Sequence, residues 1–487
     1  EERLEEIREL RLQKREALLA QQAVPYPSEA RRTHTIAEII ATAETLIADV
    51  TPIVAVGRVM SIRSHGSVVF LDLKDASGQL QLQLTRDTVS SEMFDRLATT
   101  DAGDFIQAAG KLSTTTRGIT TLLIGEFHII SKSIRPLPST WFGLKDHETR
   151  YRHREVDVLL NPTTRETMAV RSHVTQELRT RLLKRGYSEV ETPILQPLSG
   201  GATAAPFTTH HEALAMPLYL RIAPELYLKR LLVGGFEKVF EIGRNFRNEG
   251  IDREHNPEFT MLELYWAYAD YEDLMDFTEE FLWEIVTAVK NEEVKQGDIT
   301  LSFARPWQRQ RFVEVVSKAI DFDILTDQNP ATYIELFNER GLELPVVQTY
   351  SKLIDDLYKK LVRPTIIQPT LLYDYPIELA PLAKRSQTDP RLAEKFQLVV
   401  NGTEIVNAYS ELNDPVEQRQ RFVEQQEALL AGDKEAHQID EAYLRALEYG
   451  MPPAAGWGLG VDRLVAILAD APTLRDTIAF PLLRPEA

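Results

Sequence analysis

Residues 235–268 read GFEKVFEIGRNFRNEGIDREHNPEFTMLELYWAY. The apolar run 239–242 predicts a strand, and a polar loop closing at His255-Asn256-Pro257 leads into a second strand. Successive side chains of a strand point to opposite faces, so one face of the second strand carries Phe259, Met261, Glu263 and Tyr265. A carboxylate among aromatic rings is costly to bury without a partner. The segment therefore predicts a cation-binding pocket with an aromatic platform, or else an ion pair to a neighbouring helix.

A hairpin is predicted in residues 396–415, FQLVVNGTEIVNAYSELNDP, because Asn401-Gly402 is a strong two-residue turn signal. Pairing the strands around this turn makes Gln397 and Glu404 diagonal neighbours on one face. Strict alternation then points Glu404 and Glu411 in opposite directions. One site that uses both acids therefore requires a β-bulge or a strand end between them. The alternative is an edge strand with solvated charges.

A third segment, residues 456–464, reads GWGLGVDRL and predicts a glycine-rich strand that enters a helix. Alternating glycines let a ligand approach the backbone closely, and Arg463 can meet an anion at the helix start. Close packing between the helix and the strand would explain the glycines equally well.

The N-terminal third carries five short β-type runs: 54–59, 67–73, 80–84, 105–109 and 120–130. Five strands in about 80 residues fit a small OB-fold barrel. On the second run Phe70 is either a core aromatic or a platform that stacks an unpaired base, and Gln81 could hydrogen-bond the edge of that base. Arg63 could meet a phosphate, although a solvated surface arginine explains it equally simply.

The amino-acid composition and the distribution of charge exclude several classes of function. The 487 residues include no cysteine, which excludes disulfide scaffolds, zinc ribbons and thiol catalysis. The formal charge is −18, and residues 51–135 carry 9 basic and 8 acidic side chains. Non-specific nucleic-acid coating needs a strongly basic surface, so a specific single-strand reader is the form of RNA binding that fits. No apolar run reaches the ~18 residues of a membrane span and no secretory leader opens the chain, so we expect a cytoplasmic protein.

The expected organisation is α+β. Residues 1–50 form a helical extension whose first 20 residues are a solvated surface helix, 51–135 the barrel, 136–160 a linker, and 161–487 a large domain with a mostly helical insertion around 290–370. A long helix begins at Asn161-Pro162 and ends at Gly186. It carries one apolar row: Val170, Val174, Leu178 and Leu182.

Several motifs occur together and in order. They are Gly186 with Pro193; FRNE at 246–249 with HNPEF at 255–259; GLGVDR at 458–463; GGA at 200–202; RIAPEL at 221–226; ELY at 263–265; and NAYSELND at 407–414. With these motifs the chain resembles the class II lysyl-tRNA synthetases along nearly its whole length.

The resemblance implies a five-stranded OB-fold β-barrel followed by a class II catalytic domain, an antiparallel sheet flanked by helices. It implies activation of L-lysine by ATP with Mg²⁺, through lysyl-adenylate with release of pyrophosphate, and transfer of lysine to tRNA(Lys) with release of AMP. It also implies a homodimer, with the apolar row of the long helix either in the dimer interface or packed within the domain.

The resemblance also assigns residues. Arg247 and Arg463 would be catalytic, and the ATP site would hold Arg247, Glu249, His255, Phe259, Glu404 and Arg463. The lysine site would hold Gly201, Glu225, Arg247, Glu263, Tyr265, Asn407 and Glu411. The metal ligands would be Glu404, Glu411 and the residue at position 397, where the family usually has an acid and this chain has Gln397. The anticodon would contact Phe70, Gln81 and Arg63.

Three other functions are compatible with parts of the sequence. An aspartyl- or asparaginyl-tRNA synthetase would need a pocket of the opposite sign to Glu263 with Glu411. A paralogue that attaches lysine-like groups to a protein would lack the barrel at 52–133. A catalytically silent tRNA- or RNA-binding paralogue is suggested only by Gln397, against the intact Arg247, Phe259, Glu404 and Arg463.

Overall fold

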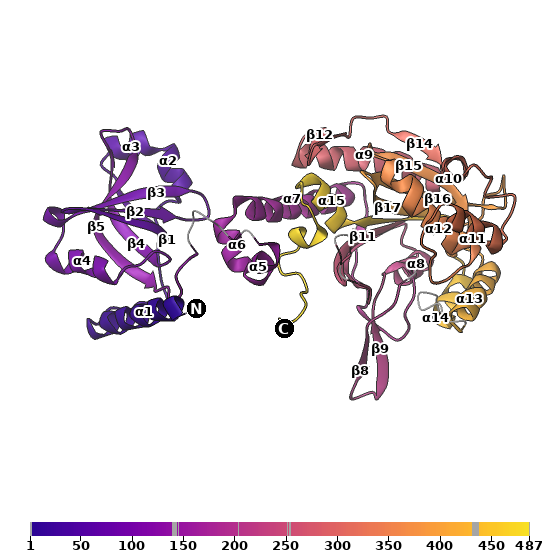
Figure 1. Cartoon of the computed structure of the whole chain (residues 1–487), viewed down its shortest axis with the longest axis horizontal. Helices are drawn as coiled ribbons and strands as arrows, with labels where there is room; N and C mark the ends of the chain where they lie inside the picture. Colours follow the sequence, from indigo (N-terminus) through magenta and orange to yellow (C-terminus); the bar gives the residue numbers. More distant parts are fainter. Residues whose placement is uncertain are drawn as a thin grey trace. The chain divides into compact units, whose positions relative to one another are not determined.

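The structure is a computed structural model that describes residues 2–138, 144, 146–202, 204–250, 252, 255–430 and 438–486. The chain divides into two compact units, Glu1–Lys145 and Asp146–Ala487 (Figure 1). Among the described residues, no helix is both long and apolar enough to cross a bilayer.

The first unit is built on the predicted five-stranded barrel, which closes in the order β1-β2-β3-β5-β4. Its strands are β1 Pro52–His65, β2 Val68–Lys74, β3 Gln79–Thr85, β4 Phe105–Thr114 and β5 Thr120–Ser131. Inward and outward side chains alternate along β2 and β3, and the inward residues form one hydrophobic core. A short helix, α4 (Ser91–Arg96), lies between β3 and β4 in sequence.

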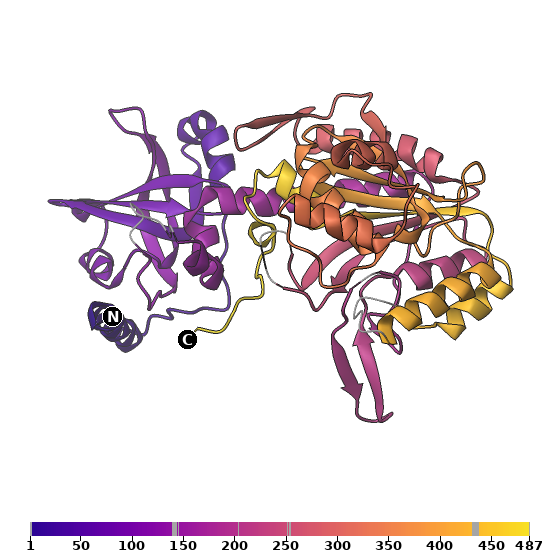
Figure 2. The ribbon, with the colours of Figure 1, turned by 45° about the vertical axis from the view of Figure 1, so that its right-hand side comes forward.

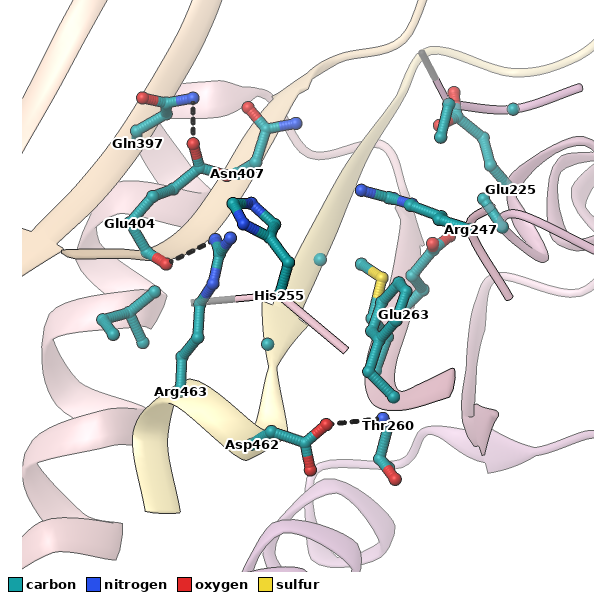
Figure 3. A pocket seen from close by; sticks show the side chains of 18 of the residues that line it. Glu225, Arg247, His255, Thr260, Glu263, Gln397, Glu404, Asn407, Asp462 and Arg463 are labelled. Carbon is teal, nitrogen blue, oxygen red and sulfur yellow. Dashed lines mark hydrogen bonds between the residues drawn. The ribbon is translucent and has the colours of Figure 1, made fainter. Parts of the chain in front are cut away.

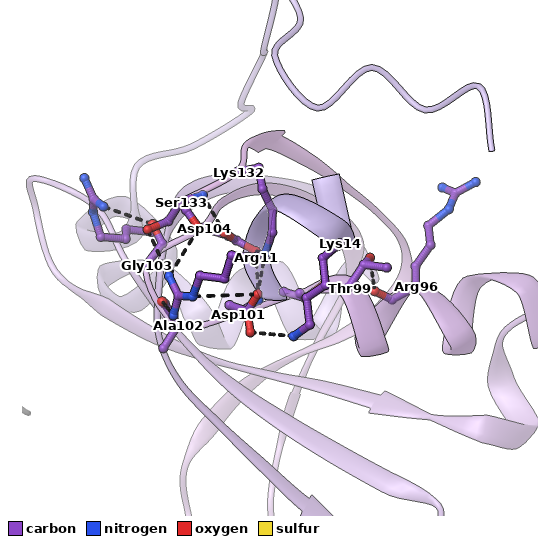
Figure 4. Close-up of polar contacts among 12 residues, drawn as sticks. Arg11, Lys14, Arg96, Thr99, Asp101, Ala102, Gly103, Asp104, Lys132 and Ser133 are labelled. Carbon is purple, nitrogen blue, oxygen red and sulfur yellow. Dashed lines mark hydrogen bonds and ion pairs between the residues drawn. The ribbon is translucent and has the colours of Figure 1, made fainter. Parts of the chain in front are cut away.

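Three helices precede the barrel: α1 Glu2–Ala20, α2 Ile36–Ala41 and α3 Ala43–Ala48. The prediction that residues 1–20 are merely solvated is wrong, because Arg11 is only 7% exposed. The Arg11 guanidinium donates to the backbone carbonyls of Ala102 (3.0 Å), Ser133 (3.2 Å) and Arg135 (3.0 Å) (Figure 4). Lys14 adds an ion pair to Asp101 at 2.6 Å. Helix α1 is therefore fastened to the barrel by buried polar contacts.

The second unit contains an eight-stranded sheet in the order β14-β15-β16-β17-β18-β11-β10-β6. Figure 2 shows this unit, with its later strands in orange and yellow and helices around them. The strands in that order are Gln308–Arg311, Thr370–Pro376, Leu392–Val400, Thr403–Ser410, Ala454–Gly460, Glu258–Ala267, Lys238–Phe246 and Ser188–Glu189. All pairs from β15 to β10 are antiparallel, as expected, whereas the outermost pairs β14–β15 and β10–β6 are parallel.

The helices α7 (Pro162–Lys184), α9 (Tyr271–Val289) and α15 (Val461–Leu468) share one hydrophobic core with this sheet. The predicted apolar row of α7 is buried in that core, at 7, 0, 0 and 0% exposure from Val170 to Leu182. The row therefore packs within the domain, which decides between the two alternatives left open by the sequence.

The linker is shorter than expected. Residues 146–160 belong to the second unit, mainly as α5 (His147–Arg152) and α6 (Arg154–Leu160). The reason is a buried arginine, since Arg154 pairs with Asp157 and donates to the carbonyl of Ala479 near the C-terminus.

The remaining elements surround the sheet. The insertion begins with the hairpin β12–β13 (Glu293–Gln296 and Ile299–Ser302) and becomes helical only with α10 (Phe312–Ile320), α11 (Pro330–Glu339) and α12 (Tyr350–Leu357). A three-stranded sheet joins β7 (Leu195–Gln196), β9 (Met216–Leu220) and β8 (Thr208–His211). Helix α8 (Glu225–Val233) packs with α13 (Pro415–Leu430) and α14 (Glu441–Glu448).

Candidate active site

A cavity of about 370 Å³ opens over the central strands of the second unit (Figure 3). It gathers residues from five separate parts of the chain. Every site residue predicted in this unit lines it except Glu411; those that do are Gly201, Glu225, Arg247, Glu249, His255, Phe259, Glu263, Tyr265, Gln397, Glu404, Asn407 and Arg463.

Strand β11 forms one wall of the cavity, and its side chains point to the two faces that the alternation of residues along the strand predicted. Phe259, Met261, Glu263 and Tyr265 line the cavity, whereas Leu262 and Leu264 enter the core. The Arg247 guanidinium lies 5.1 Å from the centre of the Phe259 ring. Its buried Nε makes no hydrogen bond to any described residue. This wall therefore offers a cation and an aromatic face side by side, which suits an anion joined to a planar base.

The opposite wall is the predicted hairpin of β16 and β17. Val399 pairs with Glu404, but Leu398 pairs with Val406, so Ile405 is an extra residue in β17. A bulge was one of the two ways in which a single site could have used both Glu404 and Glu411. Glu411 does not line the cavity, but the bulge brings Glu404 into the same cavity as Asn407. The buried Asn407 Oδ1 accepts no hydrogen bond from the residues described here. Glu404 and Asn407 together thus present oxygens of the kind that Mg²⁺ prefers.

Gln397 is held by its neighbours on both sides of its amide. Its Nε2 donates to Glu404 Oε2 at 2.8 Å, and its Oε1 accepts from the Tyr375 hydroxyl at 2.9 Å (Figure 3). The opposite amide orientation would place two acceptor oxygens 2.8 Å apart. The amide nitrogen therefore faces Glu404, and the position predicted as a doubtful metal ligand acts here as a hydrogen-bond donor. No group of three or more His, Cys, Asp or Glu suited to a metal occurs in the described ranges.

Two carboxylates lie on the cavity wall near Arg247. Glu263 is 5% exposed, and its Oε2 accepts a hydrogen bond from the Tyr265 hydroxyl at 3.1 Å. Burial and the nearby charge of Glu225 raise the pKa of Glu263 to about 8. Glu225 Oε1 accepts from the Tyr409 hydroxyl at 2.7 Å and from Lys229 Nζ at 2.6 Å. Within the described chain Glu263 forms no ion pair. The structure therefore agrees with the predicted pocket and not with the alternative, an ion pair to a neighbouring helix.

Glu411 differs from the prediction. It is 1% exposed, does not line the cavity, and forms an ion pair with Lys229 of α8, which is fully buried. The ion pair to a neighbouring helix, considered for Glu263, thus occurs at Glu411. Sequence reasoning missed Lys229, although its spacing of four residues from Glu225 on a helix was a usable signal.

In the glycine-rich strand β18, both explanations of the glycines apply: close packing accounts for one of them, and room for a ligand accounts for the others. A side chain at Gly456 would come within 2.0 Å of Glu411 Oε1, so this glycine is required by packing. Gly458 and Gly460 line the cavity, where they leave room for a ligand. Arg463 follows at the start of α15, and its Nη1 donates to the Glu404 carbonyl at 2.9 Å.

Two further residues that sequence reasoning missed fix the start of α15. Asp462 accepts a hydrogen bond from the backbone N–H of Thr260 at 2.9 Å and pairs with Arg171 of α7. Arg171 also donates to the Thr260 hydroxyl at 2.9 Å. These contacts tie α7, β11 and α15 together and so hold Arg463 in place.

In the first unit, the three predicted anticodon-binding residues share the outer face of the barrel. Phe70 is half-buried and points away from the core residues on either side of it, so it is not a core aromatic. Arg63 lies beside Phe70 on β1, and its Nη2 pairs with Asp72 at 2.9 Å. Gln81 pairs with Asp72 across β2–β3, and its Oε1 accepts from Thr121 at 2.9 Å. No described residue accepts a hydrogen bond from the Gln81 side-chain amide nitrogen, which could donate to another acceptor.

The sequence matches two family models. Residues 146–484 match tRNA synthetases class II (D, K and N), and residues 53–137 match the OB-fold nucleic acid binding domain. Proteins named lysine–tRNA ligase are similar over almost the full chain. The protein from Carboxydothermus hydrogenoformans is 45% identical over 483 residues, which is 99% of each chain. That from Pelotomaculum thermopropionicum is 45% identical over 100% of this chain and 96% of its own, and that from Thermosipho africanus 41% over 99% and 97%. The chain belongs to the lysine–tRNA ligase family of the class II tRNA synthetases.

Proposed function

We propose that the cavity of the second unit joins L-lysine to ATP and passes the activated lysine to tRNA(Lys). The observation that carries this proposal is a buried carboxylate, Glu263, which pairs with no cation among the described residues and lies near the Arg247 guanidinium in one cavity. A desolvated carboxylate recognises an ammonium group, and a guanidinium recognises carboxylate and phosphate oxygens. A silent RNA-binding paralogue is not favoured, because the residues of catalysis lie in one cavity.

The chemistry requires positioning and charge neutralisation. A carboxylate oxygen of lysine attacks the α-phosphorus of ATP, the bond to the bridging oxygen breaks, and pyrophosphate leaves with that electron pair. Arg247 would bind the lysine carboxylate and the α-phosphate, and Phe259 would stack the adenine, with Glu249 at its amino edge. Arg463 would hold the γ-phosphate beside His255. Mg²⁺ bound by Glu404 and Asn407 would supply further neutralisation of the phosphates.

Lysine recognition would use both of its amino groups. Glu225, next to Gly201, would bind the α-ammonium, and Glu263 with Tyr265 would bind the ε-ammonium. A pocket of this sign disfavours neutral and acidic amino acids.

The test of the proposed function is amino-acid-dependent ATP–pyrophosphate exchange, followed by aminoacylation of total tRNA with each of the twenty amino acids. We expect exchange and aminoacylation with lysine alone, since the other amino acids lack a long primary amine. Absence of exchange with every amino acid would instead identify a silent paralogue, and exchange with aspartate or asparagine a sibling enzyme.

The first unit would bind the tRNA anticodon, with Phe70 stacking a base, Gln81 reading its edge and Arg63 meeting a phosphate. The near-neutral barrel suits specific readout better than capture by charge.

We also propose a homodimer, as in the family, that acts in the cytoplasm, where tRNA is charged. Because the apolar row of α7 is buried inside the unit, another surface must form the interface. The neighbouring exposed side chains Ile194 and Leu195 (44 and 49% exposed) are available for it.

Replacing Gln397 tests how many metal ions accompany ATP. Gln397→Glu would put a second carboxylate beside Glu404, and two such groups are stable together only if they share a proton or a cation. We expect the variant to bind about one more Mn²⁺ per site than the parent in the presence of a non-hydrolysable ATP analogue, and to shift its Mg²⁺ optimum. Electron paramagnetic resonance counts the bound Mn²⁺. Equal Mn²⁺ stoichiometry in the two proteins would contradict the prediction that Gln397, in place of an acid, leaves the site with one metal ion fewer.

A further inference from the structure

One part of the cavity wall, residues 379–383 (LAPLA), belongs to no strand and no α-helix. Four residues of this wall segment line the cavity: Leu379, Ala380, Pro381 and Leu382. Pro381 has no N–H to donate, which interrupts regular backbone pairing. The position of the wall segment therefore depends on contacts from other parts of the chain.

The side chain of Arg421, on helix α13, holds the wall segment from outside the cavity. Arg421 is 7% exposed, and its Nη1 donates to the backbone carbonyls of Ala380 (3.2 Å), Pro381 (3.4 Å) and Ala383 (2.7 Å). Its Nη2 pairs with Glu417, one turn earlier on the same helix, which compensates the buried charge. Arg421 itself does not line the cavity. It can therefore affect the substrate only through the residues that it holds.

The wall segment borders the part of the cavity that is assigned to the lysine side chain. Leu382 belongs to one apolar cluster with Tyr265, and Tyr409 packs against the same cluster. The Tyr265 hydroxyl donates to Glu263 at 3.1 Å, and the Tyr409 hydroxyl donates to Glu225 at 2.7 Å. These two acids are assigned to the ε-ammonium and the α-ammonium. Leu382 would therefore contact the methylene chain that joins the two ammonium groups.

We infer that Arg421 is a positioning residue for lysine recognition: it holds the wall segment so that Leu382 stays against the methylene chain of the bound amino acid. Each methylene that contacts the wall contributes to binding, so a shorter diamino acid loses part of this contact. ATP is assigned to the other end of the cavity, at Phe259 and Arg463, and its binding should not depend on Arg421. This inference rests on the proposed function and deepens it.

The test compares Arg421→Met with Arg419→Met in ATP–pyrophosphate exchange. Arg419 lies on the same helix and binds Glu441 through both terminal nitrogens, at 2.7 and 2.8 Å. Arg421→Met removes the donor shared by three carbonyl groups, so the wall segment shifts and the lysine KM is expected to rise about tenfold. Arg419→Met should keep the lysine KM within about twofold of the parent. The ATP KM should change little in either variant.

The ratio of kcat/KM for lysine to kcat/KM for ornithine separates positioning from a structural role. Ornithine has one methylene fewer, and a displaced wall discriminates less by length, so the ratio should fall about threefold or more in Arg421→Met. Partial unfolding would lower the amount of active protein, and thus kcat for both amino acids, without changing either KM or the ratio. An unchanged lysine KM or an unchanged ratio in Arg421→Met would overturn the inference.

If Arg421→Met does not fold, Arg421→Lys decides. The new side chain keeps a positive charge beside Glu417, but one ammonium nitrogen replaces the two nitrogens that Arg421 divides between Glu417 and the wall segment. The lysine KM is expected to rise about threefold at an unchanged ATP KM, and a parent lysine KM would contradict the inference. Failure of the parent protein to exchange with lysine would instead disprove the proposed function, whatever the Arg421 variants do.

Discussion

Arg247→Met is expected to lower kcat for lysine-dependent ATP–pyrophosphate exchange by about 100- to 1,000-fold, the effect of removing one donor aimed at developing negative charge. In the proposed complex Arg247 would lie between lysine and ATP; it is next to the Phe259 ring, and its Nε is not engaged by any described residue. The loss should be mainly in kcat, because the guanidinium acts most strongly on the pentavalent phosphorus of the transition state. Initial rates of exchange at saturating lysine and ATP measure it.

The matched control is Arg244→Met on β10, the strand that ends just before Arg247. Arg244 does not line the cavity, and its Nε lies 3.7 Å from Glu258 Oε1 in an exposed ion pair. Its variant should keep kcat within about twofold of the parent. Arg247→Lys should recover only part of the rate, since an ammonium lacks the planar fork that binds two oxygens at once. Equal rates for Arg247→Met and Arg244→Met would remove Arg247 from the reaction.

Glu263→Gln is expected to raise the lysine KM by about 100-fold and to leave the ATP KM nearly unchanged. Truncating the charge of one partner of a buried ion pair is costly, because the other charge stays buried without compensation. Glu258→Gln, at the exposed start of the same strand, is the control and should affect neither constant. Equal changes in the two constants for Glu263→Gln would exclude Glu263 from ammonium recognition.

The pH dependence of the lysine KM gives a second measure of Glu263. Its pKa in the free protein is raised to about 8, by burial first and by Glu225 second. Below this pH the carboxyl is mostly protonated, and the ε-ammonium must displace that proton to bind. The lysine KM should therefore fall as pH rises from 6 to 8, by up to about tenfold per unit, and level off above pH 8. Glu263→Gln should abolish this slope, whereas a retained slope would assign it to another group.

The sequence alone predicts those features that depend on local periodicity. The barrel strands and the face of β11 that carries Phe259 and Glu263 follow from alternation, and the β16–β17 turn follows from Asn401-Gly402, both of which adopt positive φ. The assignment of Arg463 to the cavity came from its place in a motif. Glu404 and Glu411 lie an odd number of residues apart, so parity predicted a bulge or a strand end if both acids served one site; the bulge is present at Ile405, but Glu411 does not line the cavity.

Long-range contacts could not be predicted in this way. The amide of Gln397 is oriented by Tyr375 and Glu404, and no pattern around residue 397 contains that information. The pairing of Glu411 with Lys229 joins residues far apart in the sequence through the packing of α8 against the sheet. Helix α1 was predicted to be solvated for the same reason. Its charged sequence does not reveal that Arg11 donates to three backbone carbonyl groups of residues distant in the chain.

The Arg11 contacts affect how the OB-fold domain can be produced as a separate fragment. In a fragment that starts at residue 51, the backbone carbonyls of Ala102, Ser133 and Arg135 would lose the hydrogen-bond donor that α1 supplies. A separately expressed barrel domain must therefore keep α1. Its C-terminal boundary can be placed after the barrel and before α5, which begins at His147.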